Sequence, residues 1–129
     1  MRKRQHLKIG YFADGPWAHN ALERLRKDPD VSIVFICARY NNPDLYLKEK
    51  ARELGISFHI EKDVNSYSFL DLIGHYQCNL FVSMSFDQIF RRHLYALPEL
   101  GAINCHAGKL PFYRGRNIWS FSSTFINKM

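Results

Sequence analysis

The stretch Val31-Ser32-Ile33-Val34-Phe35-Ile36-Cys37-Ala38 is an almost continuous apolar run, interrupted only by Ser32. Such a run is typical of a parallel strand that is covered on both faces of its sheet. A β-rich run at Leu7–Ala13 precedes it, and the segment between them has apolar residues at helical spacing after Pro16. The sequence therefore predicts a strand, a helix and a second strand parallel to the first.

The same alternation continues toward Cys105. The expected strands are 7–13, 31–38, 56–60, 80–85 and 102–105; one helix starts at Pro16, one runs from Asn42-Pro43 to Gly55, and two more cover 67–75 and 88–97. Short connections between strands and helices imply right-handed crossovers and a parallel sheet. The expected fold class is α/β, a Rossmann-like parallel sheet of about five strands with flanking helices, in a single domain over residues 1–129.

Composition narrows the class of protein. A hydrophobic fraction of 47% can fill a core and argues against disorder. The net charge of +6 suits a phosphate-bearing ligand and would also allow nucleic acid, although a generic basic protein would look the same. The three cysteines, Cys37, Cys78 and Cys105, form no CxxC pair and are expected to be buried thiols in a reducing compartment. No apolar run approaches transmembrane length and no signal peptide is recognisable, so we expect a cytoplasmic protein without a membrane partner.

The richest motif follows the last expected strand. It reads Asn104-Cys105-His106-Ala107-Gly108-Lys109-Leu110-Pro111, and Phe112-Tyr113-Arg114-Gly115 comes next. Residues i and i+2 of an extended segment point the same way, so Asn104 and His106 should project together at the carboxyl end of a strand, where open α/β sheets bind ligands. An amide that donates to an oxyanion beside an imidazole that moves a proton is the minimum equipment for acyl transfer. Cys105 should point away from both and is not expected to be a nucleophile.

Two other segments should lie near this edge. Gly15 and Trp17 follow the first strand, where a helix N-terminus can bind an anion; the alternative is a plain turn with Trp17 in the core. The loop after the fourth strand carries apolar and polar side chains suited to a flat heteroaromatic ligand, or else core anchors; its candidates are Phe86, Asp87, Gln88, Ile89 and Phe90.

Two charged residues are candidates for substrate binding, and no motif for a metal ion or a dinucleotide is found. Lys109 and Arg114 flank the Asn/His turn and are candidates to meet an anionic substrate, although helix-terminus charge is an equal alternative. The other histidines have no partner at metal-ligand spacing, so no metal site is expected. No GxGxxG follows the first strand, so dinucleotide binding has no support.

The motif resembles the hallmark of the folate-dependent formyltransferases, which include methionyl-tRNA formyltransferase and glycinamide ribonucleotide transformylase. That hallmark is Asn-x-His-x-Ser-x-Leu-Pro followed by Arg-Gly, and the matching residues are Asn104, His106, Leu110, Pro111, Arg114 and Gly115. Gly108 stands where the family usually has Ser. The run 106–111, together with Gly15-Pro16-Trp17, is most similar to the sugar N-formyltransferases, and the resemblance covers about residues 7–117.

The resemblance implies a reaction and a set of roles. The formyl donor would be N10-formyltetrahydrofolate, and the acceptor a nucleotide-linked amino deoxysugar of the kind used in lipopolysaccharide O-antigen biosynthesis. Asn104 would stabilise the oxyanion and His106 would handle the proton of the attacking amine. Residues 86–90 would line the pterin site, and Gly15, Trp17, Lys109 and Arg114 are expected on the substrate side. No metal and no nucleic acid are implied, and the full-length form would be a homodimer.

The sequence departs from the family in one respect. The family's third catalytic residue is an Asp far downstream of the Asn/His motif, and no Asp follows Asp87 in this sequence. The family's last two strands also have no counterpart, so we expect a domain that is incomplete at its C-terminus and weakly active or inactive. Formyltetrahydrofolate hydrolysis, a non-catalytic folate or nucleotide-sugar binding module and, more weakly, an RNA-binding protein remain as alternatives.

Overall fold

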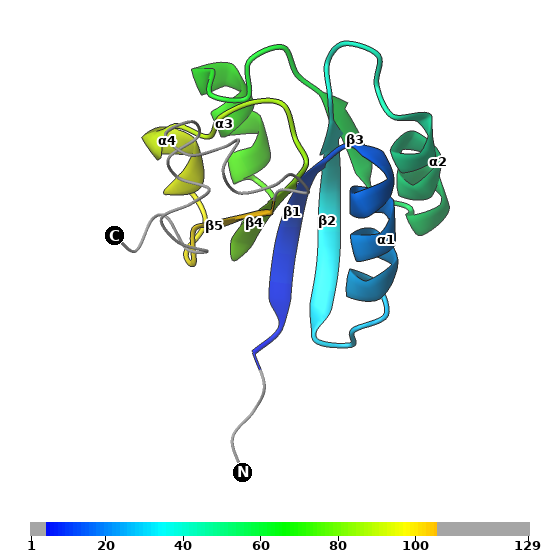
Figure 1. Ribbon diagram of the computed structural model, residues 1–129. Helices are drawn as coiled ribbons and strands as arrows, with labels where there is room; N and C mark the ends of the chain where they lie inside the picture. The colour runs from blue at the N-terminus through cyan, green and yellow to red at the C-terminus, as the bar shows by residue number, and fades with distance from the viewer. Residues whose placement is uncertain (1–4, 106–129) are drawn as a thin grey trace, which may run out of the picture.

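Residues 5–105 are described by the structure, a computed structural model (Figure 1). The elements in this part of the chain are β1 (Leu7–Ala13), α1 (Gly15–Leu25), β2 (Val31–Ala38), α2 (Leu45–Leu54), β3 (Ser57–Ile60), α3 (Tyr67–Gly74), β4 (Leu80–Met84), α4 (Arg92–Tyr95) and β5 (Ala102–Cys105). The strands form one parallel sheet in the order β3-β2-β1-β4-β5. The predicted fold class is therefore confirmed.

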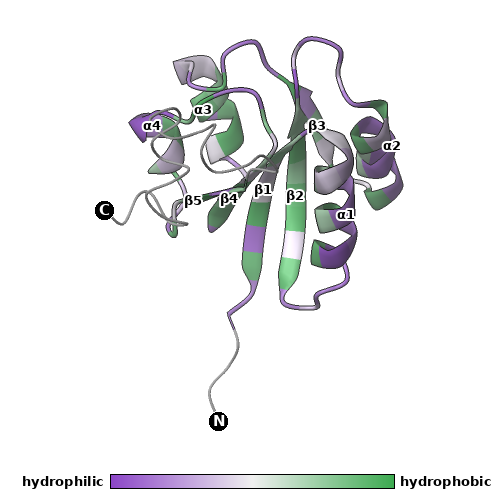
Figure 2. Cartoon of the chain, viewed as in Figure 1, coloured by the Kyte–Doolittle hydropathy of each residue, from purple (hydrophilic) through white to green (hydrophobic). Residues whose placement is uncertain are grey.

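The sheet separates two cores. On one face, Leu22 of α1 and Leu47 of α2 pack with Tyr11 and Ile36 of the central strands. On the other face, Phe69 of α3 and Leu94 of α4 pack with Phe12. Figure 1 shows this arrangement of helices, and Figure 2 shows mostly apolar colouring along β1 and β2 and a mixture of polar and apolar colouring along α1 and α2. Because all strands are parallel, the carboxyl ends of all five lie along one edge of the sheet.

The starts of α1 and α2 are joined by one carboxylate. Asp44 Oδ1 accepts hydrogen bonds from the backbone N–H groups of Tyr46 and Leu47, at 3.0 and 3.2 Å, and so caps α2. Asp44 Oδ2 accepts from the N–H of Gly15 at 2.9 Å and lies 2.7 Å from His19 Nε2. The expected helix start at Asn42-Pro43 is wrong by a few residues because this carboxylate sets it at Leu45.

The fourth helix is also shorter than expected. The sequence predicts a helix over 88–97, but α4 covers only Arg92–Tyr95. The reason is that residues 88–91 are held in a loop. The N–H of Arg91 donates to Asn65 Oδ1 at 2.7 Å, and the side chain of Gln88 bonds to the backbone of residues 61–64.

Close packing on the central strand gives a first prediction. A Cβ on Gly10 of β1 would lie 2.5 Å from Cζ of Phe35 and 2.9 Å from Cδ1 of Phe81, both in the core. We expect Gly10→Ala to lower the free energy of unfolding by about 1–3 kcal/mol, the usual cost of overpacking. Gly74→Ala is the matched control, since no atom lies within 4 Å of its Cβ position and its backbone is helical. Urea unfolding followed by circular dichroism compares the two; equal losses would contradict the packing argument.

The Asp44 bridge gives a second prediction. Partial burial by itself raises the pKa of Asp44, but hydrogen bonds from Gly15, His19 and Leu47 outweigh it and hold the pKa below its usual value. A carboxyl with a lowered folded-state pKa contributes stability above its unfolded pKa of about 3.9, and this is lost as the pH falls through the folded value. Asp44→Asn should therefore destabilise the protein at pH 7, by about 1–2 kcal/mol, and much less below about pH 3. Unfolding measured from pH 2 to 7 checks this; a difference that does not change with pH would refute it.

Candidate active site

Asn104 lies at the carboxyl end of β5, beside the end of β4. In the parallel register Ser83 pairs with Asn104, and the N–H of Ser85 donates to the carbonyl of Cys105 at 3.1 Å. The predicted neighbourhood of β4 and Asn104 is thus confirmed, whereas His106, the other member of the predicted pair, lies outside the described residues. Within residues 5–105, the buried atoms Asn104 Nδ2, Ser83 Oγ and Ser85 Oγ have no hydrogen-bond partner. An amide donor and two hydroxyls are therefore gathered where the two strands end.

Alternation along β5 assigns each side chain to a face. Ile103 and Cys105 line a hollow on the α1 side of the sheet, whereas Ala102 belongs to the core on the α3 and α4 side. Asn104 therefore faces the α3 and α4 side, and Cys105 points away from it, as the sequence predicts. Burial raises the pKa of the Cys105 thiol, which keeps it protonated and a poor nucleophile.

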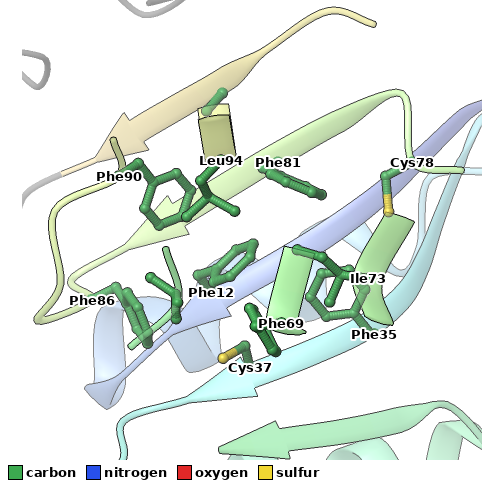
Figure 3. Close-up of a cluster of buried hydrophobic side chains, with 12 residues drawn as sticks. Phe12, Phe35, Cys37, Phe69, Ile73, Cys78, Phe81, Phe86, Phe90 and Leu94 are labelled. Atoms are coloured by element: carbon green, nitrogen blue, oxygen red, sulfur yellow. The ribbon is translucent and has the colours of Figure 1, made fainter. Parts of the chain in front are cut away.

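The loop between β4 and α4 is fixed to the core by two aromatic rings. Phe86 and Phe90 are 7% and 1% exposed, and their rings meet Phe12 edge-on with centroids 5.7 and 4.7 Å apart (Figure 3). These two predicted folate-binding residues are core anchors, as the alternative interpretation held. Asp87 and Ile89 are exposed, so theirs are the side chains of the loop that a ligand could contact directly.

Two amide side chains tie this loop to the loop that follows β3. Gln88 Oε1 accepts from the N–H of Val64 at 2.9 Å, and Gln88 Nε2 donates to the carbonyl of Glu61 at 2.8 Å. Asn65 Nδ2 donates to the carbonyl of Ile89 at 2.9 Å, and its Oδ1 accepts from Arg91. The side-chain amide of Gln88, which was predicted to contact folate, is thus hydrogen-bonded to the neighbouring loop. Sequence reasoning missed Asn65, although its place between an expected strand and helix was a signal of a loop side chain.

The start of α1 differs from the expectation for an anion site. The N–H of Gly15, one of the free donors expected there, is bonded to Asp44. Trp17 is 64% exposed, so the interpretation that placed it in the core is wrong. Its ring borders a hollow of about 300 Å³ that Arg24 and Met84 also line. Trp17 therefore remains available to a substrate, whereas the Gly15 N–H is already paired.

Acidic groups dominate the edge above β1. Asp14 follows β1, and burial, together with the nearby charges of Asp44 and Asp87, raises its pKa, while Arg39 at 3.9 Å opposes this. A second anion at this point would meet that negative field. An anionic ligand group is therefore less favoured at the β1 end of this edge.

Several predicted residues lie outside the part of the chain that the structure describes. These are His106, Lys109 and Arg114. Among the described residues, no group of three His, Cys, Asp or Glu side chains is arranged to hold a metal ion. No helix in that same range is long and apolar enough to span a membrane.

The chain is similar in sequence to methionyl-tRNA formyltransferases. The chain is 28% identical over 123 residues to methionyl-tRNA formyltransferase of Protochlamydia amoebophila, covering 89% of this chain and 38% of the relative. It is 41% identical over 69 residues to the enzyme of the same name from Natranaerobius thermophilus, covering 53% of this chain and 22% of that one. The chain thus spans about two-fifths or less of these relatives. No family model matches it.

The solved structures agree at the level of the fold. Glycinamide ribonucleotide transformylase 1 from Geobacillus kaustophilus superposes with a TM-score of 0.64 at 14% identity, covering 86% of this chain and 64% of that one. The corresponding protein from Symbiobacterium toebii gives 0.58 at 16% identity, with coverages of 84% and 55%. The chain is thus similar in sequence to methionyl-tRNA formyltransferases, and it shares its fold with glycinamide ribonucleotide transformylases.

Proposed function

We propose that this chain carries part of the active site of a formyltransferase that moves a formyl group from N10-formyltetrahydrofolate to a primary amine. The observation that carries the proposal is Asn104, whose buried amide N–H group has no partner within the described residues and stands at the carboxyl end of β5. That group is a hydrogen-bond donor held ready for an acceptor that the described fold does not supply. A formyl oxygen is such an acceptor.

Asn104 would act on the charge that develops at this oxygen. When the amine nitrogen bonds to the formyl carbon, the C=O electron pair moves to oxygen, and Asn104 Nδ2 donates a hydrogen bond to the resulting negative charge. Because Nδ2 is buried, its interaction is screened less than it would be in water. Strand pairing fixes the position of Asn104, since β4 and β5 are paired as far as Met84 and Cys105.

His106 would manage the proton. As the amine forms its bond to carbon, its nitrogen becomes cationic, and the neutral imidazole accepts the proton that it loses. The C–N bond to the folate then breaks, and that nitrogen leaves with its electron pair and a proton. Folate would supply only the formyl group and a flat ring system.

The described residues fit such a donor. The exposed side chain of Ile89, in the loop after β4, offers an apolar contact for a flat ring. The acceptor that the motif favours is the amine of a nucleotide-linked amino deoxysugar, with the exposed Trp17 as a candidate contact. A methionyl-tRNA acceptor is the second candidate, because the similar curated relatives bear that name. Lys109 and Arg114 remain candidates for phosphate contacts in either case.

The role of Asn104 is tested by its removal. We expect the protein to bind 5-formyltetrahydrofolate, a stable analogue of the donor, in isothermal titration calorimetry. In the full-length enzyme of which this chain is proposed to be a part, Asn104→Ala should lower kcat for formyl transfer by about 100- to 1,000-fold, the usual loss for one oxyanion donor, with KM for the donor changed much less. Gln5→Ala, which removes an exposed amide before the start of β1, at the opposite edge of the sheet, is the matched control. Unchanged transfer in Asn104→Ala would refute the proposed role.

Product analysis separates the remaining interpretations. With labelled N10-formyltetrahydrofolate and each acceptor in turn, a formylated amino sugar or formylmethionyl-tRNA identifies the acceptor. Free formate alone would instead favour a hydrolase, and binding without any turnover would favour a folate-binding module. We expect a formylated amine.

The expectation that the catalytic domain continues beyond Met129 remains a prediction. The mass of the protein from its native cell should exceed the 15.2 kDa of this chain. A mass of 15.2 kDa would contradict it and favour the binding module.

A further inference from the structure

Two loops that the sheet does not connect are joined at the carboxyl edge by a reciprocal pair of amide side chains. Gln88 of the second loop bonds to the backbone of Val64 and Glu61 in the first. Asn65 of the first bonds to the backbone of Ile89 and Arg91 in the second. Each amide uses one donor and one acceptor, so four hydrogen bonds of 2.7–2.9 Å form between residues 61–65 and residues 88–91.

The topology makes this connection informative. The first loop follows β3 and the second follows β4, but β2 and β1 lie between these strands in the sheet. Strand pairing therefore does not hold the loops together. Val64 is fully buried in the same core as Phe86 and Phe90, so the two loops also share one apolar floor. They form a single wall over the ends of β1 and β2, on the face toward which Asn104 points.

We infer that residues 61–66 are part of the proposed folate site and that Asn65 is a positioning residue for it. This inference rests on the proposed function. Asn65 Nδ2 holds the backbone carbonyl of Ile89, whose side chain is 50% exposed and offers the loop's apolar contact for a flat ring. A loop that is fixed before binding loses less conformational entropy when the ligand arrives, so the hydrogen bonds of Asn65 increase affinity without touching the ligand.

The chemistry of the amide explains why an asparagine is needed. Its side chain donates through Nδ2 and accepts through Oδ1, which are the two functions used here. An aspartate at this position would keep the acceptor for the Arg91 N–H but would place a carboxylate oxygen against the carbonyl of Ile89. An alanine would lose both bonds. Comparing the two substitutions therefore separates the effect of the bond to the Ile89 carbonyl from the effect of the bond to the Arg91 N–H.

The test measures loop protection and ligand affinity on the same variants. In hydrogen-exchange mass spectrometry without ligand, Asn65→Ala should make amides of residues 88–91 exchange on the order of tenfold faster. In calorimetry, the Kd for 5-formyltetrahydrofolate should rise by about three- to tenfold. Asn65→Asp should fall between wild type and Asn65→Ala in exchange at Arg91, which shows that the effect follows the hydrogen bonds rather than unfolding. Gln5→Ala, at the opposite edge of the sheet, should match wild type in both measurements.

The outcomes distinguish this inference from the function on which it rests. If the wild type binds the analogue and Asn65→Ala binds it equally well, the positioning role is wrong and the proposed function stands. Faster exchange spread over the whole sheet would also overturn it, since Asn65 would then be a general stability residue. If the wild type does not bind the analogue, the folate proposal itself fails, and the positioning role fails with it.

Discussion

The ring of Phe12 is the contact on which the rest of this structure depends. It is fully buried at the centre of the sheet, and other aromatic rings meet it at steep angles with centroids 4.7–6.5 Å away; these are Phe35, Phe69, Phe81, Phe86 and Phe90 (Figure 3). They come from both neighbouring strands, from α3 and from the loop after β4. Edge-to-face pairs add to the free energy of burial and favour particular ring orientations. Phe12 therefore joins the sheet, a helix and the loop beside the candidate site into one packed unit.

The arrangement of strands could be predicted because each central strand is covered on both faces. Val31–Ala38 carries apolar residues on both sides for this reason, and its run of hydrophobic letters cannot be mistaken for a surface strand. Helix boundaries were harder, since side chains distant in sequence decide them. Asp44 sets the start of α2 while also holding α1, and Asn65 keeps residues 88–91 out of a helix. The spacing of apolar residues along the sequence does not predict such hydrogen bonds.

In the candidate site, too, some features could be predicted from the sequence and others could not. Asn104 was predictable because it ends an apolar strand, and the ends of parallel strands share an edge. The sequence could not predict which side chains of the 86–90 loop are buried and which are exposed, because aromatic residues in a short loop suit a core and a ligand equally well. Trp17 shows the opposite error, since helical spacing placed it with buried residues whereas it is largely exposed. The spacing identifies a face of the helix but not whether another element covers that part of the face.

The distribution of unpaired polar groups points to one end of the edge. At the β1 end, Asp44 satisfies the N–H of Gly15 and the first N–H groups of α2, and the local charge is negative. At the β4 and β5 end, Ser83, Ser85 and Asn104 each keep a buried polar atom without a partner in residues 5–105. Each such atom costs about 1–3 kcal/mol if it stays unpaired, and Ser85 also adopts a positive φ of 56°. In residues 5–105, the buried polar atoms of this edge that still lack a hydrogen bond therefore lie at the β4 and β5 end. The formyl oxygen of the proposed reaction would bind there.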